Sequence, residues 1–178
     1  MHVGLEGKRV AILIADLYQP LEFWYPYYRF KEAGARVIVV GEKAGEGYRS
    51  KEGLTATADR SAADVSAGEF DAVVVPGGFA PDRMRRIPAM VDLVQEMDRR
   101  GKVVAAIRHA GWVRISARVV EGRRATCVAS IRDDMEKAGA RYVDEEVVID
   151  GSLITSRTPA DLPAFCPAVL AALGNGEG

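Results

Sequence analysis

The sequence has few of the residues that hold metals or form disulfides. Its 178 residues include only two cysteines, Cys127 and Cys166, and only two histidines, His2 and His109. The cysteines lie far apart and match neither a disulfide framework nor a metal-binding cluster. Two imidazoles argue against a zinc site of the usual kinds. We therefore expect no structural metal and no disulfide.

The chain also lacks a dominant charge and a long apolar run. Lys and Arg number 24 against 25 Asp and Glu, so the formal net charge is −1, and the two signs are interspersed. This balance is unlike the basic surface of proteins that bind nucleic acid or lipid headgroups. No stretch is long and apolar enough for a membrane span or a signal peptide. The composition predicts a cytoplasmic protein with no nucleic-acid and no membrane partner.

A phosphate-binding loop is missing as well. The glycine pair in Pro76–Gly78 (PGG) is too short for a P-loop or a dinucleotide-binding fingerprint. These glycines predict instead a tight turn in which the backbone can approach a neighbouring segment closely. We expect the protein to use no nucleotide and no other cofactor.

The sequence does contain apolar runs that alternate with helical patterns. Four runs are continuously apolar, as parallel strands covered on both faces are: Arg9–Ala15, Arg36–Val40, Ala72–Val75 and Val103–Ile107. Leu21–Ala33 and Ala89–Arg100 carry apolar residues at helical spacing and are each followed by a glycine. This alternation predicts a doubly wound α/β fold with a mainly parallel sheet.

Two further segments predict hairpins. Glu42–Arg60 is polar and glycine-rich, which predicts a β-hairpin or arm outside the sheet. Val147–Ile149 and Leu153–Thr155 are strand-like and flank Asp150-Gly151, a favoured two-residue turn. No linker divides the chain, so we expect a single domain over residues 1–178 whose tail, 174–178, frays.

The stretch GKVVAAIRHAGWVRISARVV, from Gly101 to Val120, breaks sharply from a strand into a helix. In α/β enzymes such a turn lifts one side chain above the carboxyl edge of the sheet and often displays a nucleophile. The raised position here is Arg108. A guanidinium stays protonated and has no free electron pair at neutral pH, so Arg108 cannot attack a carbonyl carbon.

Several motifs together resemble the DJ-1/PfpI superfamily, and within it the PfpI-like intracellular protease/deglycase branch. The matching pieces follow the family order along nearly the whole chain: LEFWYPYYRFKEAG (21–34), FDAVVVPGGFAPDRMR (70–85), AAIRHAGWVRISA (105–117), IRDDMEKAGA (131–140) and VVIDGSLITSRTPADLPAF (147–165). The resemblance implies a flavodoxin-like sandwich that assembles as a homodimer or homohexamer.

The resemblance also implies where a site would lie. The family's nucleophilic cysteine falls on Arg108, and the histidine after it falls on His109. The family's activating glutamate falls on Gln19, and an acid contributed across a subunit interface falls on Asp82. The backbone N–H groups of Gly78 and His109 would form the oxyanion hole. By this reasoning, chemistry that depends on a thiolate at the elbow is excluded.

The residue pairing suggests a new use for the elbow. With Gln19 in place of the glutamate, Arg108 would have no carboxylate of its own and could hold a substrate carboxylate, phosphate or enolate through two hydrogen bonds. The other interpretation is that Arg108 points to solvent or pairs with a nearby acid such as Glu22. His109 is the candidate general acid–base, because its ordinary pKa lies near neutral pH.

We therefore expect a cofactor-free enzyme without a cysteine nucleophile, acting on a small anionic or carbonyl ligand by proton transfer, as isomerases, hydratases, cyclases and lyases do. The alternative is a catalytically silent relative with a binding, chaperone-like or stress-response role. The predicted catalytic residues are His109, Arg108 and Asp82; the predicted substrate-binding residues are Gln19, Gly78, Trp112 and Tyr18; no metal ligands are predicted.

Overall fold

The computed structural model describes residues 4–174 of the chain. His2 and residues 175–178 of the predicted tail lie outside this range, whereas Gly174 is the last residue of a helix. A seven-stranded sheet forms the centre, in the order β10-β11-β7-β6-β1-β2-β5. Every neighbouring pair is parallel except the pair of β10 with β11 at one edge. The predicted flavodoxin-like, doubly wound fold is confirmed.

The strands of this sheet follow the apolar runs of the sequence. They are β1 (Arg9–Leu13), β2 (Arg36–Gly41), β5 (Arg60–Ser61), β6 (Ala72–Val75), β7 (Val103–Ile107), β10 (Val148–Asp150) and β11 (Leu153–Ser156). All side chains of β6 and β7 are buried, which explains why their runs are apolar without alternation. The turn between β10 and β11 consists of residues 151 and 152, one residue later than the sequence predicts, because Asp150 pairs with Leu153.

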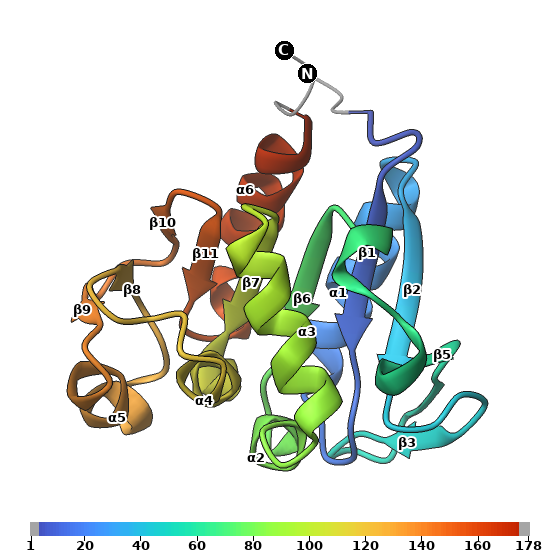
Figure 1. Cartoon of the computed structure of the whole chain (residues 1–178), viewed down its shortest axis with the longest axis horizontal. Coiled ribbons are helices and arrows are strands. Elements are labelled where there is room, and N and C mark those ends of the chain that lie inside the picture. The colour runs from blue at the N-terminus through green and yellow to red at the C-terminus, as the bar shows by residue number, and fades with distance from the viewer. Residues whose placement is uncertain (1–3, 175–178) are drawn as a thin grey trace.

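Helices cover both faces of the sheet (Figure 1). The helices α1 (Pro20–Glu32) and α6 (Leu162–Gly174) pack against each other on one face. The helices α2 (Ala80–Met84), α3 (Pro88–Arg99) and α4 (Gly111–Ser116) lie on the other face. Short 3₁₀ segments complete the connections: η1 (Ala62–Asp64), η2 (Ala67–Glu69), η3 (Arg108–Ala110), η4 (Ala129–Ile131) and η5 (Pro159–Asp161).

The predicted arm is present as a separate antiparallel pair, β3 (Gly47–Arg49) with β4 (Thr55–Thr57). It joins the loop that follows β1, because Leu17 N–H donates to Arg49 O at 2.7 Å and Lys51 N–H donates to Tyr18 O at 3.1 Å. The arm thereby brings residues of segment 42–60 to the carboxyl edge of the sheet.

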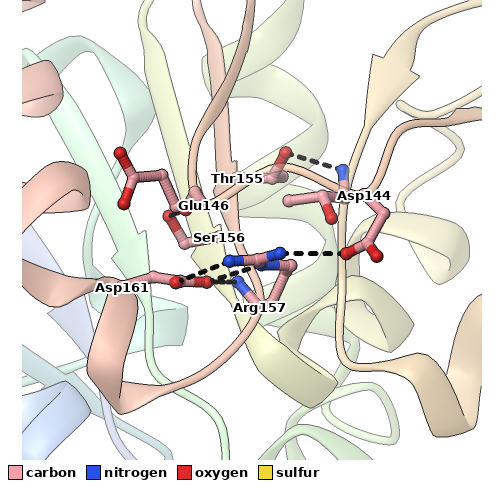
Figure 2. A network of polar contacts seen from close by, with 7 residues as sticks. Asp144, Glu146, Thr155, Ser156, Arg157 and Asp161 are labelled. Atoms are coloured by element: carbon pink, nitrogen blue, oxygen red, sulfur yellow. Dashed lines mark hydrogen bonds and ion pairs between the residues drawn. The ribbon is translucent and has the colours of Figure 1, made fainter.

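A second small unit packs beyond β11. It contains β8 (Arg124–Ala125), β9 (Arg141–Tyr142) and α5 (Arg132–Lys137), which enclose their own cluster of buried apolar residues. Arg157, at the end of β11, connects this unit to the main sheet (Figure 2). Its guanidinium donates to Asp144 Oδ1 at 3.0 Å and, from two nitrogens, to both carboxylate oxygens of Asp161 at 3.0 Å.

Within residues 4–174, no helix is long and apolar enough to cross a membrane. The same residues contain no cluster of three or more His, Cys, Asp or Glu side chains placed to hold a metal ion.

Candidate active site at the strand–helix elbow

The elbow lies where β7 passes through η3 into α4. Arg108, the first residue after β7, has φ of 63°, in the left-handed region that non-glycine residues rarely adopt. Such a conformation costs on the order of 1–2 kcal/mol and is concentrated at functional sites. The elbow is therefore a strained turn, as expected for a displayed side chain.

The side chain of Arg108 lies beside a buried acid. Its Nη1 is 3.9 Å from Oε2 of Glu22, whose side chain is wholly buried, while the Arg108 side chain keeps 27% of its surface exposed. Glu22 Oε1 accepts a hydrogen bond of 2.9 Å from Gly77 N–H. A Cβ at Gly77 would collide with this oxygen, so a glycine is needed at this close approach.

The expectation that Arg108 has no carboxylate of its own is therefore wrong. Gln19, predicted to stand in the place of the family's glutamate, is the N-cap of α1: its Oε1 accepts from Leu21 N–H at 2.6 Å and Glu22 N–H at 3.3 Å. Glu22 lies one helical turn later on the side of α1 that faces the elbow. The alternative in which Arg108 pairs with Glu22 agrees with this geometry.

Polar atoms at the elbow are left without partners. Among the described residues, no hydrogen bond reaches the buried atoms Arg108 Nε, Glu22 Oε2 and His109 Nδ1. Burial raises the pKa of the Glu22 carboxyl to about 7. The charges of Arg108 and Lys51 and the Gly77 N–H act in the opposite direction. Glu22 can consequently gain or lose a proton near neutral pH.

His109 is half-buried directly after Arg108. Its Nε2 lies 3.2 Å from Ser130 Oγ, and its ring centroid is 5.2 Å from that of Trp112. Burial lowers the pKa of the imidazole, and the positive charges of Arg108 and Lys51 lower it further. Both effects favour the neutral form of the imidazole, which has a free electron pair for a proton.

The structure places the other predicted residues as follows. Trp112 adjoins His109 and donates its indole N–H to Asp134 Oδ2 at 2.9 Å. Gly78, with φ of 84°, packs against the loop at 17–19, where a Cβ would collide with Gln19 N and Leu17 O.

The remaining two predicted residues, Tyr18 and Asp82, form no hydrogen bond or ion pair with the side chain of Arg108 or His109 within residues 4–174. Tyr18 is fully buried, and its hydroxyl donates to Leu54 O at 2.9 Å, so its side chain belongs to the core. Asp82 is exposed on α2.

Neither cysteine supplies a thiolate at the elbow. Cys127 is 1% exposed and Cys166 is fully buried. Burial raises the pKa of each thiol to about 12, so both are protonated at neutral pH.

Sequence reasoning missed the role of Lys51 and Ser130 near this site. Lys51 comes from the arm and acts electrostatically on both Glu22 and His109. Ser130 comes from η4, some twenty residues after the elbow. Neither lies in a pattern that distinguishes it from surface residues, because only the tertiary fold brings these segments together.

Comparison with known proteins identifies close relatives. The model of the DJ-1/PfpI family matches residues 8–172. A deglycase of Pyrococcus abyssi is 45% identical over 157 residues, which cover 88% of this chain and 94% of that protein. "Protein/nucleic acid deglycase 2" of Escherichia coli is 41% identical over 170 residues, which cover 94% of this chain and 99% of that protein.

A solved structure agrees with these matches. A two-domain protein of Anabaena variabilis, with DJ-1/ThiJ/PfpI-like and ferritin-like domains, is 47% identical and superposes with a TM-score of 0.93. The match covers 96% of this chain but 49% of that protein, so this chain spans about half of its length.

These relatives correct the functional prediction. An isomerase-, hydratase-, cyclase- or lyase-like activity, or a silent relative as its alternative, was expected from the arginine at the elbow. Proteins 41–45% identical over most of the chain are instead named deglycases, and neither name indicates an isomerase, hydratase, cyclase or lyase. The exclusion of a deglycase was drawn from one position, whereas the similarity extends over nearly the whole chain.

Proposed function

We propose a deglycase-type function for this chain, which belongs to the DJ-1/PfpI family. Such a function removes a glycation group from an amine. The observation that supports it is the placement of a half-buried imidazole, His109, directly after the partly exposed Arg108 at the strained elbow. Deglycation of an early adduct requires a group that can accept and return a proton.

The reaction is balanced without a cofactor. In a carbinolamine, the first adduct of an aldehyde with an amine, one carbon bears both a hydroxyl group and the amine nitrogen. The hydroxyl loses its proton, the C=O bond forms, the C–N bond breaks and the nitrogen gains a proton. One proton thus moves from oxygen to nitrogen, which a general acid–base group can accelerate by about 10²–10⁴-fold.

In this proposal His109 accepts the hydroxyl proton and returns it to the leaving nitrogen. Burial and the nearby positive charges favour its neutral form, which suits the first step. Arg108 donates hydrogen bonds to the oxygen while negative charge develops there, together with the N–H groups of Gly78 and His109. Because a guanidinium has no free electron pair at neutral pH, Arg108 stabilises the oxygen and forms no covalent bond.

The experiment measures free amine released from a fresh methylglyoxal adduct of N-acetyl-lysine, with the spontaneous rate subtracted. We expect the wild-type protein to accelerate release and His109→Asn to lower kcat/KM by about 10²-fold or more. The control is Arg118→Gln, at an exposed arginine with a similar positive φ of 59°. This control should retain full activity.

The assay with Arg108→Cys completes the test. Release by this variant but not by the wild type would overturn the proposal, since the pocket would then suit a thiolate and this chain's own residues would not perform the reaction. Absence of release from all variants, with the fold verified by circular dichroism, would overturn it as well.

A further inference from the structure

We infer that the elbow binds a small carboxylate at Arg108 and that a proton on Glu22 opens the site for it. This inference names a ligand class and its regulation, and it rests on the same site as the proposed function. It requires no turnover.

The first step is the poor pairing within the elbow. Arg108 Nη1 and Glu22 Oε2 are 3.9 Å apart, well beyond hydrogen-bond distance, and Arg108 Nε and Glu22 Oε2 are both buried without a partner. Leaving a buried charged group unpaired costs several kcal/mol. Because they are too far apart, the two side chains form no hydrogen bond with each other. The guanidinium therefore retains N–H donors for another acceptor.

The second step is access. More than a quarter of the Arg108 side-chain surface is exposed, whereas Glu22 is wholly enclosed by α1, the elbow and the loop after β6. A ligand from solvent can consequently reach Arg108 and not Glu22. The planar guanidinium matches a carboxylate, which can accept two parallel hydrogen bonds from it.

The third step is the local charge. The charged groups that act on the Glu22 carboxyl are Arg108, from η3, and Lys51, from the arm, while Gly77 N–H donates to it from the loop after β6. When Glu22 is ionised, it neutralises Arg108 and repels an incoming anion. When Glu22 is protonated, Arg108 has one uncompensated positive charge, which suits a singly charged ligand.

The coupling has a defined pH dependence. The Glu22 carboxyl has a pKa of about 7, so the fraction in the neutral, binding-competent form falls about tenfold per pH unit above that value. The apparent dissociation constant rises by the same factor, because it is the intrinsic constant divided by that fraction. By linkage, binding also takes up protons from solution.

The experiment is isothermal titration of the full chain with acetate and with lactate at pH 6 and pH 8. We expect wild-type affinity to fall roughly tenfold between these pH values. Repeating the pH 8 titration in buffers of different ionisation enthalpy should show net proton uptake. Glu22→Gln should bind with an affinity that is the same at both pH values, because its amide cannot ionise.

Two matched variants locate the ligand. Arg108→Gln should abolish binding, whereas Arg118→Gln, at an exposed arginine of similar backbone conformation, should leave it unchanged. Equal wild-type affinity at both pH values, or a pH dependence that survives in Glu22→Gln, would overturn the inference. Inorganic phosphate that binds as tightly as acetate would overturn the assignment to carboxylates.

The outcomes separate this inference from the proposed function. Gated binding of acetate without amine release would leave the inference intact and the deglycase-type function overturned. Amine release without any binding of carboxylates would overturn the inference and leave the deglycase-type function intact.

Discussion

Arg157, whose side chain is 31% exposed, and Arg114, which is fully buried, differ in their hydrogen-bond partners. The Arg157 guanidinium donates to Asp161 and Asp144 from three nitrogens, and Arg157 N–H also donates to Asp161 (Figure 2). These partners raise the pKa of Arg157. Arg114, in α4, is fully buried, and none of its three guanidinium nitrogens meets a partner among the described residues.

Arg157 therefore stabilises the fold through its hydrogen bonds, whereas the unpartnered Arg114 lowers the free energy of unfolding. Burial lowers the pKa of Arg114 to about 10, and repulsion from Arg123 adds to this effect. Arg108, six residues earlier, is intermediate: it has an acid nearby but no hydrogen bond to it. Partners, and not burial alone, decide whether an arginine stabilises a structure.

The largest expected effect is the loss of the satisfied arginine. Arg157→Met removes the guanidinium donors of Asp161, which is 5% exposed, and leaves that buried carboxylate without its ionic partner; the backbone N–H of residue 157 remains as a donor. Breaking such a pair costs about 4 kcal/mol. For a chain of this size, the Tm measured by calorimetry should fall by roughly 8–16 °C.

Arg132→Met is the matched control for this loss. Arg132 pairs with Glu136 across one turn of α5, and both side chains are largely exposed. Such a pair contributes about 0.5 kcal/mol. A comparable fall in Tm for both variants would show that the network around Arg157 is no more than a surface ion pair.

A slightly smaller effect is expected from the intermediate case at the elbow. The Glu22 carboxyl has a pKa of about 7 in the folded protein, compared with an ordinary value of 4.5. Between pH 4.5 and about pH 7, the folded state therefore binds more protons than the unfolded state. The free energy of unfolding therefore falls as the pH rises through this window. From pH 4 to pH 8 the loss is on the order of 3 kcal/mol.

Chemical denaturation of the wild type and of Glu22→Gln at these two pH values isolates this contribution. The variant keeps an oxygen for Gly77 N–H but cannot ionise, so the difference in unfolding free energy between the two proteins should shift with pH. If the difference in unfolding free energy were the same at both pH values, Glu22 would titrate at an ordinary pKa. Its carboxyl would then be more hydrated than its burial indicates.

The fold was predictable because it depends on local apolar patterns. The runs at Ala72–Val75 and Val103–Ile107 are strands with the predicted bounds, since strands buried on both faces leave an unbroken apolar signature. The elbow at Arg108 was found in the same way, from a strand that meets a helix without a linker.

The partners within the site were not predictable from sequence. Gln19 and Glu22 both lie near the start of α1, and only the docking of that helix shows that the first caps it while the second faces Arg108. Similarly, the helical spacing of α4 does not reveal that Arg114 is enclosed without a partner, because that depends on the segments packed over it.

The smallest expected effect is a gain of stability at Arg114. Arg114→Met replaces a buried, unpartnered guanidinium by an apolar side chain of similar length. Replacing buried charges by apolar residues that fit is often stabilising, here by about 2 kcal/mol. The Tm should therefore rise by roughly 4–8 °C.

Arg123→Met tests whether this gain is specific to the unpartnered arginine. Arg123 donates to Asp98 at 2.8 Å, and both side chains are partly buried, so its loss should lower stability. Opposite signs for two arginines nine residues apart would show that hydrogen-bond partners determine the outcome. A fall in Tm for Arg114→Met would contradict this interpretation, because it would require the Arg114 guanidinium to gain a partner when the protein folds.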